Sequence, residues 1–207
     1  MAPSQLLLVR HGETEWSRSG QHTGLTDVPL TETGEGQARA LRPLLAHVSP
    51  ACVLVSPLTR ARRTAELAGL CIDQVEPDLL EWDYGGYEGL TTPQIREQTG
   101  NATWTVFKDG VVPGDTPGES IDEVAERARR VLDRARQLMT DSDVVLVAHG
   151  HVLRVLAACW LEADPVLGAR LLLDAGTLSA LGEQHGVTAV AFWNTSPTQL
   201  PEPSGGR

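Results

Sequence analysis

Two apolar runs, far apart in the chain, end in the same way, with a histidine followed by a glycine. His11 follows the apolar residues 6–9 and a single arginine, and His149 follows the apolar residues 144–148. An apolar run of this length that stops abruptly at polar residues is typical of a strand buried on both faces of a sheet. Open α/β sheets bind ligands at the carboxyl ends of their strands. We therefore predict that the two histidines contribute to one site.

The apolar stretches alternate with helical patterns. Strands are predicted at residues 5–9, 51–55, 70–75, 143–148, 177–181 and 187–193, and helices at 34–47, 57–68, 119–140 and 150–162. This alternation predicts an α/β fold, a three-layer sandwich in which helices cover both faces of a mostly parallel central sheet. No helix separates the last two strands, and Gly182 with His185-Gly186 is typical of a hairpin turn, so one strand near an edge is expected to be antiparallel.

Segment 82–118 interrupts this pattern. It is rich in glycine and proline, and a short helix at about 92–99 is the best element within it. A long irregular insert in a compact domain is usually functional, so we expect a lid over the site, with a packing loop as the alternative. The predicted organisation is one domain over residues 1–194 that carries this lid, followed by a disordered tail at 195–207, rich in Pro, Ser and Gly.

The charge balance limits the partners. The chain has 27 acidic and 17 basic residues and a formal net charge of -10, which argues against nucleic acid or an anionic membrane as a partner.

No apolar run reaches membrane-spanning length, and the first residues lack the pattern of a signal peptide. Cys52 and Cys159 lie in apolar segments as core thiols, so a reducing, cytoplasmic location is expected. Exposed charges are screened beyond roughly 8 Å in physiological salt, so a few cations inside a pocket decide whether an anion binds.

The residues beside the histidines suit an anion. Arg10 precedes His11 at a strand end, and its planar guanidinium can grip an anion in two places. Gly12 lets the backbone approach a ligand closely. An anion site at the end of this strand is therefore expected.

Arg60 is expected to supply a second cation. Ser56 is a suitable N-cap and Pro57 suits the first helical position, so a helix is predicted to begin there. Helical side chains tilt toward the N-terminus, so Arg60 in the first turn should point back to the site, where the helix N-terminus also favours an anion. Arg62 and Arg63, further along, are expected on a solvated face.

Further blocks accompany these segments. They are residues 6–16 (Leu-Leu-Leu-Val-Arg-His-Gly-Glu-Thr-Glu-Trp), Thr23-Gly24, Leu30-Thr31 with Gly34, residues 56–61 (Ser-Pro-Leu-Thr-Arg-Ala), Glu81 with Tyr84-Gly85, and residues 148–150 (Ala-His-Gly). In this order and spacing, from residue 5 to about residue 155, the chain resembles the histidine phosphatase family, also called the phosphoglycerate mutase-like family.

The resemblance implies a chemistry for the histidines and arginines. His11 is the expected nucleophile, because an unprotonated imidazole nitrogen can attack phosphorus while the other nitrogen donates to a fixed acceptor. The resemblance implies that this acceptor is a backbone carbonyl and that the intermediate is a phosphohistidine. Arg10, Arg60 and His149 are expected to hold the non-bridging oxygens, where the transition-state charge lies, with His149 protonated while phosphate is bound.

Glu81 is the expected proton donor to the leaving group, and later the base for the attacking water. Its neighbours Leu79 and Trp82 give the apolar surroundings that suit a carboxyl group in this role. Asp83 and Glu88 are the alternatives, for which a surface charge or a structural hydrogen bond is the simpler interpretation. The family pattern, in which the acid precedes a Tyr-Gly pair, favours Glu81.

Five residues are expected to contact the substrate. The loop from Thr14 to Gly24 should close over the phosphoryl group. The contacts expected from the loop and from the other family blocks are Ser17, Thr23, Gly24 through its amide, Tyr84 and Gly150.

The remaining histidines raise the question of a metal. His151 follows His149 by two residues, and such a pair can ligate a metal. No further cluster of histidines or carboxylates is expected at strand ends to complete a coordination shell, so neither a metal nor another cofactor is predicted. His22, His47 and His185 are expected to lie on solvent without a role.

A few positions bear on the reaction class. Mutase members of the resembled family carry extra cations for the carboxylate of the substrate, but this chain has Gln21, Thr92 and the uncharged lid residues 104–107, with Lys108 beside them. Hydrolysis is therefore favoured, and the chain is expected to be a metal-independent phosphomonoesterase that acts on small phosphorylated metabolites, with sugar phosphates as the expected substrates. Phosphoglycerate mutase activity, or a phosphate-binding module without turnover, is the alternative.

Two branches of the family match the loops. Residues 20–27 are similar to sedoheptulose-1,7-bisphosphatase-type members, and residues 81–92 are similar both to these and to bacterial acid phosphatases. The expected partner is a small phosphorylated substrate, with no nucleic acid and no membrane. The sequence leaves the oligomeric state open, with a homodimer as one option.

Overall fold

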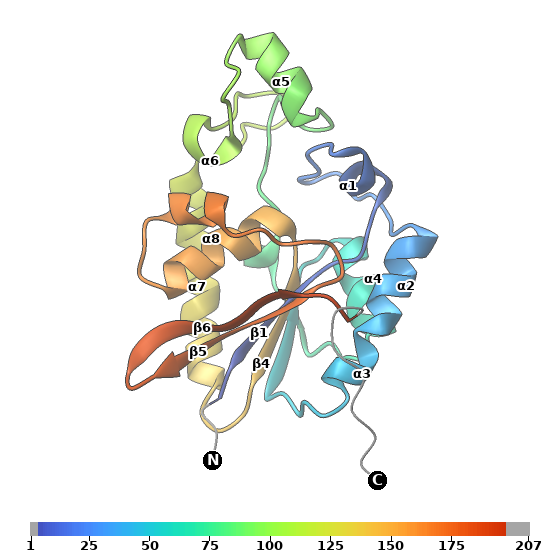
Figure 1. Cartoon of the computed structure of the whole chain (residues 1–207), viewed down its shortest axis with the longest axis vertical. Coiled ribbons are helices and arrows are strands. Elements are labelled where there is room, and N and C mark those ends of the chain that lie inside the picture. The colour runs from blue at the N-terminus through green and yellow to red at the C-terminus, as the bar shows by residue number, and fades with distance from the viewer. Residues whose placement is uncertain (1–3, 198–207) are drawn as a thin grey trace.

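One sheet organises residues 4–197, the part of the chain that the computed structural model describes. Its strand order is β3-β2-β4-β1-β5-β6 (Figure 1). The strands are β1 (Leu6–Arg10), β2 (Cys52–Val55), β3 (Gln74–Val75), β4 (Val144–Ala148), β5 (Leu178–Gln184) and β6 (Val187–Thr195). The first four run parallel, whereas β5 is antiparallel to both of its neighbours. The predicted α/β fold, mostly parallel with an antiparallel strand near one edge, is confirmed.

The pairing of β1 with β4 brings the two His-Gly sequences together. Leu6 pairs with Val144 and Arg10 pairs with Ala148, so both strands end at the same edge of the sheet. His11 then donates its backbone N–H to the carbonyl oxygen of Ala148 at 3.0 Å. The two histidines that follow these strands are therefore neighbours, although they are far apart in the sequence.

Helices cover both faces of the sheet, as predicted (Figure 1). On one face lie α2 (Glu32–Ala40), α3 (Arg42–Leu45) and α4 (Thr59–Leu67), and on the other lie α7 (Ile121–Leu138) and α8 (Gly150–Trp160). Successive side chains of a strand point to opposite faces. In β1, Leu6 and Leu8 therefore join the core under α7 and α8, whereas Leu7 and Val9 join the core under α3 and α4.

Two predicted elements are shorter or divided. The helix expected over 34–47 is split between α2 and α3, with Pro43 at the start of α3, because proline cannot donate within a helix. The strand expected over 70–75 is formed only by Gln74–Val75.

The hairpin turn between β5 and β6 consists of His185 and Gly186, whereas Gly182, which we also predicted in the turn, lies within β5. Both turn residues have positive φ, 55° and 78°. A two-residue turn of this kind matches the twist of the strands it joins.

The insert at 82–118 lies at one end of the molecule (Figure 1). Its helix α5 (Thr92–Thr99) matches the prediction, and it is followed by a further short helix, α6 (Val106–Asp109). The short helix α1 (Glu15–Ser19) lies at the same end. Two 3-10 helices complete the fold, η1 (Pro77–Leu79) and η2 (Pro165–Arg170).

Two expectations concern the ends and surface of the chain. The tail predicted from residue 195 starts inside β6, which ends at Thr195, and residues 198–207 lie outside the described residues. None of the helices in residues 4–197 has the length and apolar character needed to cross a bilayer.

Candidate active site

His11 stands directly after β1 and is 5% exposed. Its Nδ1 lies 2.7 Å from the carbonyl oxygen of Gly12. Burial, and then the guanidinium groups of Arg60 and Arg10, hold the pKa of His11 well below its ordinary value. The ring is therefore neutral, and because a carbonyl oxygen can only accept, Nδ1 carries the proton and Nε2 keeps its lone pair. This is the arrangement that a nucleophilic imidazole requires.

His149 follows β4, and its ring centroid lies 5.0 Å from that of His11. Its Nδ1 accepts a hydrogen bond from Nε of Arg60 at 3.1 Å, because the arginine nitrogen can only donate. The proton of the neutral ring is therefore on Nε2, which lies 2.7 Å from Oγ of Ser56. Burial and the charge of Arg60 hold the pKa of His149 well below its ordinary value. The protonated form expected with phosphate would require Arg60 to move away from Nδ1.

The side chain of Arg60 is fully buried in the first turn of α4. Besides the bond to His149, it donates to the carbonyl oxygens of Thr23, Gly24 and Thr26 at 3.1, 2.9 and 2.8 Å. We predicted that Arg60 would point into the pocket. In the structure its guanidinium instead bonds the loop over 23–26 and links it to His149, which follows β4.

The start of α4 corrects a second prediction. The helix begins at Thr59 with Leu58 as the N-cap, not at Pro57 with Ser56 as the cap. The carboxylate of Asp27 accepts from the backbone N–H and the hydroxyl of Thr59, at 2.9 and 2.8 Å, and so caps the helix from another loop. Ser56 is thereby left to contact His149, a role that the sequence analysis missed.

Arg10 ends β1 and donates Nη1 to the carbonyl oxygen of Leu173. Its Nε is buried and has no hydrogen-bond partner among the protein atoms of the described residues. An unpaired buried N–H on a cation is costly, and the residue also lines the adjoining cavity, where its charge favours an anion. A Cβ atom at Gly150 would lie 3.3 Å from Cζ of Arg10, so the glycine lets the guanidinium lie close to the start of α8.

Gly12 has a different role from the one predicted. Its backbone N–H donates to Oγ1 of Thr64 at 3.1 Å. A Cβ atom at this position would lie 2.2 Å from the carbonyl oxygen of Gly34. The absence of a side chain at Gly12 therefore allows close packing against α2 and does not serve an anion contact.

Glu81 is 5% exposed and lies beside the N-terminus of α8. Its carboxylate accepts three backbone N–H groups at 2.9 Å, those of Trp82, His151 and Val152. The last two belong to the first turn of α8, whose N–H groups have no partner within the helix. The carboxylate therefore has a fixed place at the site.

Asp83 and Glu88, the alternative acids, have structural hydrogen bonds. Asp83 accepts from the N–H of Gly85 at 2.9 Å and from the hydroxyl of Thr116 at 2.6 Å. Glu88 accepts the N–H of Gly24 at 2.9 and 3.0 Å. The amide of Gly24, which we predicted to contact phosphate, is thus already bonded to a carboxylate.

A cavity of about 260 Å³ brings most of the predicted residues together. The predicted residues that line it are Arg10, His11, Ser17, Thr23, Glu81, Tyr84 and Gly150. Arg60, His149 and Gly24 are not part of the lining, although the His149 ring is a neighbour of His11 and Arg60 bonds to it. The cavity is therefore lined by the expected nucleophile, the expected acid and two arginines, Arg10 and the unpredicted Arg154.

His22 lines this cavity, although we predicted it on solvent. It is 9% exposed, its ring lies 4.7 Å from that of Tyr84, and Nε2 lies 3.3 Å from Oγ1 of Thr92. Burial lowers the pKa of His22 to about 4. His47 and His185 are exposed, as predicted. Nothing in the polar sequence around His22 signals burial, because the groups that cover it come from the insert.

His151 also lines the cavity, and it is paired with Tyr84. Its Nδ1 lies 2.6 Å from the hydroxyl oxygen of Tyr84 and 3.9 Å from Oε2 of Glu81. Burial and Arg154 hold the pKa of His151 well below its ordinary value, while burial and Glu81 hold that of Tyr84 well above its own. The tyrosine therefore donates to Nδ1. Across residues 4–197, no three His, Cys, Asp or Glu side chains are grouped so that they could hold a metal.

Comparison with known proteins agrees with this geometry. Residues 6–196 match the model of the histidine phosphatase superfamily, branch 1. An acid phosphatase of Mycobacterium tuberculosis is 41% identical over 203 residues, which cover 97% of this chain and 97% of that protein. Sedoheptulose 1,7-bisphosphatase of Saccharomyces cerevisiae is 36% identical over 179 residues, which cover 74% of this chain and 66% of that protein.

A solved structure gives the same result. The protein of an open reading frame from Mycobacterium tuberculosis superposes with a TM-score of 0.87 at 40% sequence identity, covering 94% of this chain and 98% of that one. The likeness extends over the sheet and the insert together. The chain therefore belongs to the histidine phosphatase superfamily, and its enzyme class is that of a phosphatase.

Proposed function

We propose that this chain hydrolyses small phosphomonoesters in two steps, through a phosphohistidine on His11. One observation supports this most directly. His11 is neutral, its Nδ1–H is held by the Gly12 carbonyl, and its ring lines a cavity together with Arg10 and Glu81. A nucleophile, a cation and a carboxyl group are what such a reaction needs in one place.

In the first step, Nε2 of His11 attacks phosphorus, and the bond from phosphorus to the leaving oxygen breaks with its electron pair on that oxygen. Glu81 in its protonated form donates a proton to the oxygen, so that an alcohol leaves. The new N–P bond makes the ring cationic. The Gly12 carbonyl at Nδ1–H stabilises this charge.

In the second step, water attacks the phosphohistidine. Glu81, now ionised, accepts a proton from the water as the oxygen bonds to phosphorus. The N–P bond breaks, its electron pair returns to Nε2, and inorganic phosphate is released. Both groups are then restored for the next cycle.

The positive charge for the transition state is proposed to come from side chains. Arg10 lines the cavity, and its guanidinium is proposed to hold a phosphoryl oxygen. Arg60 and His149 stay proposed ligands of the phosphoryl oxygens, and binding through them requires the 3.1 Å bond between them to open. With these groups in place, no metal is needed to stabilise the charge.

A second cavity of about 260 Å³ suits the leaving group. It shares His22, Thr92, His151 and Arg154 with the first cavity, and Trp104 and Phe107 of the insert form part of its wall. Aromatic faces and uncharged imidazoles suit the carbon skeleton and hydroxyl groups of a sugar. We propose that the insert at 82–118 acts as a lid by supplying this wall, and that sugar phosphates are the substrates.

Two arginines also border this cavity, which the sequence analysis did not anticipate. Arg154 donates to the carbonyl oxygens of residues 168–169 at 2.8 and 3.0 Å and lies 4.7 Å above the ring of Phe107. Arg96 donates Nε to the carbonyl oxygen of Trp104 at 3.2 Å. We propose that these bonds brace the wall, and we favour hydrolysis over mutase activity because Gln21 and Thr92, which also line the first cavity, carry no charge for a substrate carboxylate.

A cytoplasmic location belongs to the same proposal. Cys52, Cys71 and Cys159 are free thiols, and the first and last are buried as predicted. Free thiols suit a reducing compartment.

The proposal is tested by phosphate release from a panel of sugar phosphates and 3-phosphoglycerate, with and without EDTA. We expect phosphate from the sugar phosphates at the same rate in EDTA, and a rapid alkaline quench should trap an acid-labile, alkali-stable phosphoenzyme. Loss of activity on chelation, restored by zinc or manganese, would instead indicate a metal enzyme. Formation of 2-phosphoglycerate faster than phosphate would indicate a mutase.

A further inference from the structure

Glu81 belongs to no helix or strand. It follows η1 and precedes the irregular first part of the insert. Its carboxylate is held by N–H groups of α8, but a carboxylate can be held in this way only if its backbone is also in place. The contacts of the neighbouring residues, 78–80 and 82–83, therefore decide where the carboxyl group lies.

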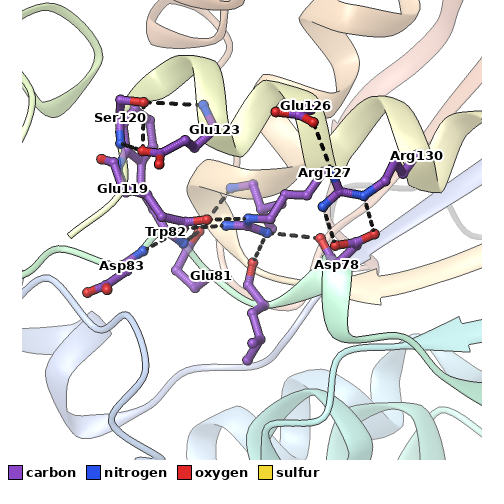
Figure 2. Close-up of polar contacts among 12 residues, drawn as sticks. Asp78, Glu81, Trp82, Asp83, Glu119, Ser120, Glu123, Glu126, Arg127 and Arg130 are labelled. Carbon is purple, nitrogen blue, oxygen red and sulfur yellow. Dashed lines mark hydrogen bonds and ion pairs between the residues drawn. The ribbon is translucent and has the colours of Figure 1, made fainter. Parts of the chain in front are cut away.

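Arg127 fixes the chain before Glu81. It extends from the middle of α7 and is 6% exposed. Its Nη1 donates to the carbonyl oxygens of Asp78 at 2.9 Å and Leu80 at 2.5 Å (Figure 2). Leu80 is the residue directly before Glu81, so this guanidinium anchors the backbone on that side.

Glu119 fixes the chain after Glu81. Its two carboxylate oxygens accept Nε and Nη2 of Arg127 at 2.8 and 3.0 Å (Figure 2). The same carboxylate accepts the backbone N–H of Asp83 at 2.9 Å, and the carbonyl oxygen of Glu119 accepts Nε1 of Trp82 at 2.8 Å. The ion pair thus holds the backbone on both sides of the proposed acid.

An ion pair between a buried arginine and a carboxylate that is 24% exposed is not explained by stability alone. Removing two charges from water costs several kcal/mol per ion, and apolar residues of similar volume often stabilise a fold as well or better. The planar guanidinium of arginine binds the carboxylate with two parallel bonds while a third nitrogen reaches two carbonyl oxygens, a geometry that the compact ammonium of lysine does not offer. The geometry of the ion pair therefore suits a role in positioning the backbone beside Glu81.

We propose that Arg127, acting with Glu119, is a positioning residue for Glu81. The inference rests on the proposed role of Glu81 as the proton donor. Without the Arg127 guanidinium, the backbone over 78–83 is held less closely. The carboxyl group of Glu81 then no longer lies where it can donate a proton to the leaving oxygen. A displacement of 1 Å can cost on the order of 100-fold in rate.

Arg130 offers a matched control. It lies three residues along the same helix, and it also contacts η1, through the carboxylate of Asp78 at 2.9 and 2.7 Å (Figure 2). Its side chain is 52% exposed, and the bonds end on a side chain, not on the backbone beside Glu81. Arg130→Met therefore removes an arginine from the same place without loosening the acid.

The test measures single-turnover phosphorylation with two substrates, a sugar phosphate from the panel and p-nitrophenyl phosphate, whose leaving group needs little protonation. Arg127→Lys should slow the sugar phosphate by roughly 10–100-fold and the aryl ester by less than about threefold. Arg130→Met should leave both rates within about twofold. Equal losses on both substrates for Arg127→Lys would overturn the inference.

A double-mutant cycle separates positioning from general damage. If Arg127 acts through Glu81, then Arg127→Lys should have no further effect in a Glu81→Ala background, whereas independent effects would multiply. Multiplied effects would overturn the inference while leaving the acid role intact. If Glu81→Ala itself slows both substrates equally, the acid role and the inference fall together. Should Arg127→Lys not fold, Glu119→Gln replaces it. In either orientation the amide nitrogen would face an N–H group, that of Asp83 or Nε of Arg127, and break part of the same support.

Discussion

The first cavity, proposed to bind the phosphoryl group (the phosphoryl end), and the second cavity, proposed to bind the leaving group (the leaving-group end), are built in different ways. At the phosphoryl end, His11 and His149 each follow a buried strand, and the pairing of β1 with β4 sets their separation. At the leaving-group end, His22 and Trp104 come from loops, and their positions depend on contacts between segments outside the sheet. The strand ends thus position the proposed nucleophile, whereas the loops and the insert form the wall that is proposed to contact the leaving group.

The largest expected effect is at the phosphoryl end. His11→Ala should lower phosphate release by at least about 10⁴-fold, because no other imidazole in the cavity is placed after β1 to attack phosphorus. The fold should persist, since a buried neutral ring is replaced by a smaller apolar group. Phosphate release by the variant within tenfold of the parent, measured with a far-UV spectrum as the control for folding, contradicts the assignment of the nucleophile.

Glu81 lines the first cavity, and the effect of its loss should depend on the leaving group. Glu81→Ala should cost roughly 10²–10⁴-fold on a sugar phosphate and clearly less on p-nitrophenyl phosphate in single-turnover phosphorylation. Dephosphorylation, which needs the same carboxylate as a base, should then become slow and give a burst of p-nitrophenol. Asp83→Asn and Glu88→Gln serve as controls. If either of them shows a larger difference than Glu81→Ala between the rate losses on the two substrates, that residue is the proton donor instead.

A smaller effect is expected at the leaving-group end. Trp104→Leu should raise KM for a sugar phosphate by about tenfold, the usual scale for losing part of an apolar contact, with little change in kcat. The inhibition constant of inorganic phosphate should stay the same, because phosphate contacts only the other end. The exposed Phe192→Leu on β6 is the matched control. If the inhibition constant of inorganic phosphate rises by the same factor as KM, the phosphoryl group and the leaving group do not bind at separate ends, and the proposal is wrong.

The smallest effect concerns pH and stability. The pKa of His22 is about 4 in the folded protein against an ordinary value of 6.5, so between these values the unfolded state binds a proton that the folded state does not. The free energy of unfolding therefore falls as pH falls through this window. His22→Gln should reduce that fall by up to about 3 kcal/mol, measured by urea unfolding at pH 7 and pH 4.5. His47→Gln, at an exposed histidine, should not, and equal pH dependence of the parent and His22→Gln would show that His22 is not buried as a neutral ring.

The strand ends could be read from the sequence because the signal there is local. An apolar run that stops at Arg10 or His149 marks both a strand and the edge where it ends. To predict that the two histidines lie together, it is not necessary to know which strands pair, because the carboxyl ends of parallel strands lie at the same side of a sheet. The proposed nucleophile, the adjacent arginine and the second histidine can therefore be named from the sequence.

The contacts between loops could not be read in this way. Ser56 was taken for a helix cap because its own sequence suits one, but Asp27 supplies the cap from a distant loop. His22 was placed on solvent because its neighbours are polar, whereas the insert covers it. In each case a residue far away in the sequence changed the role of a local pattern.

The place of β1 in the sheet has a consequence for folding. Although β1 is formed by the first described residues, both of its neighbours come late, since β4 begins at Val144 and β5 at Leu178. During synthesis from the N-terminus, the apolar strand Leu6–Arg10 has no partner on either side until most of the chain exists. Contacts between such distant segments are slow to form, because a long loop must close first. A shorter nascent chain therefore carries His11 on an unpaired strand without its phosphate site, and exposes an edge that other chains can bind.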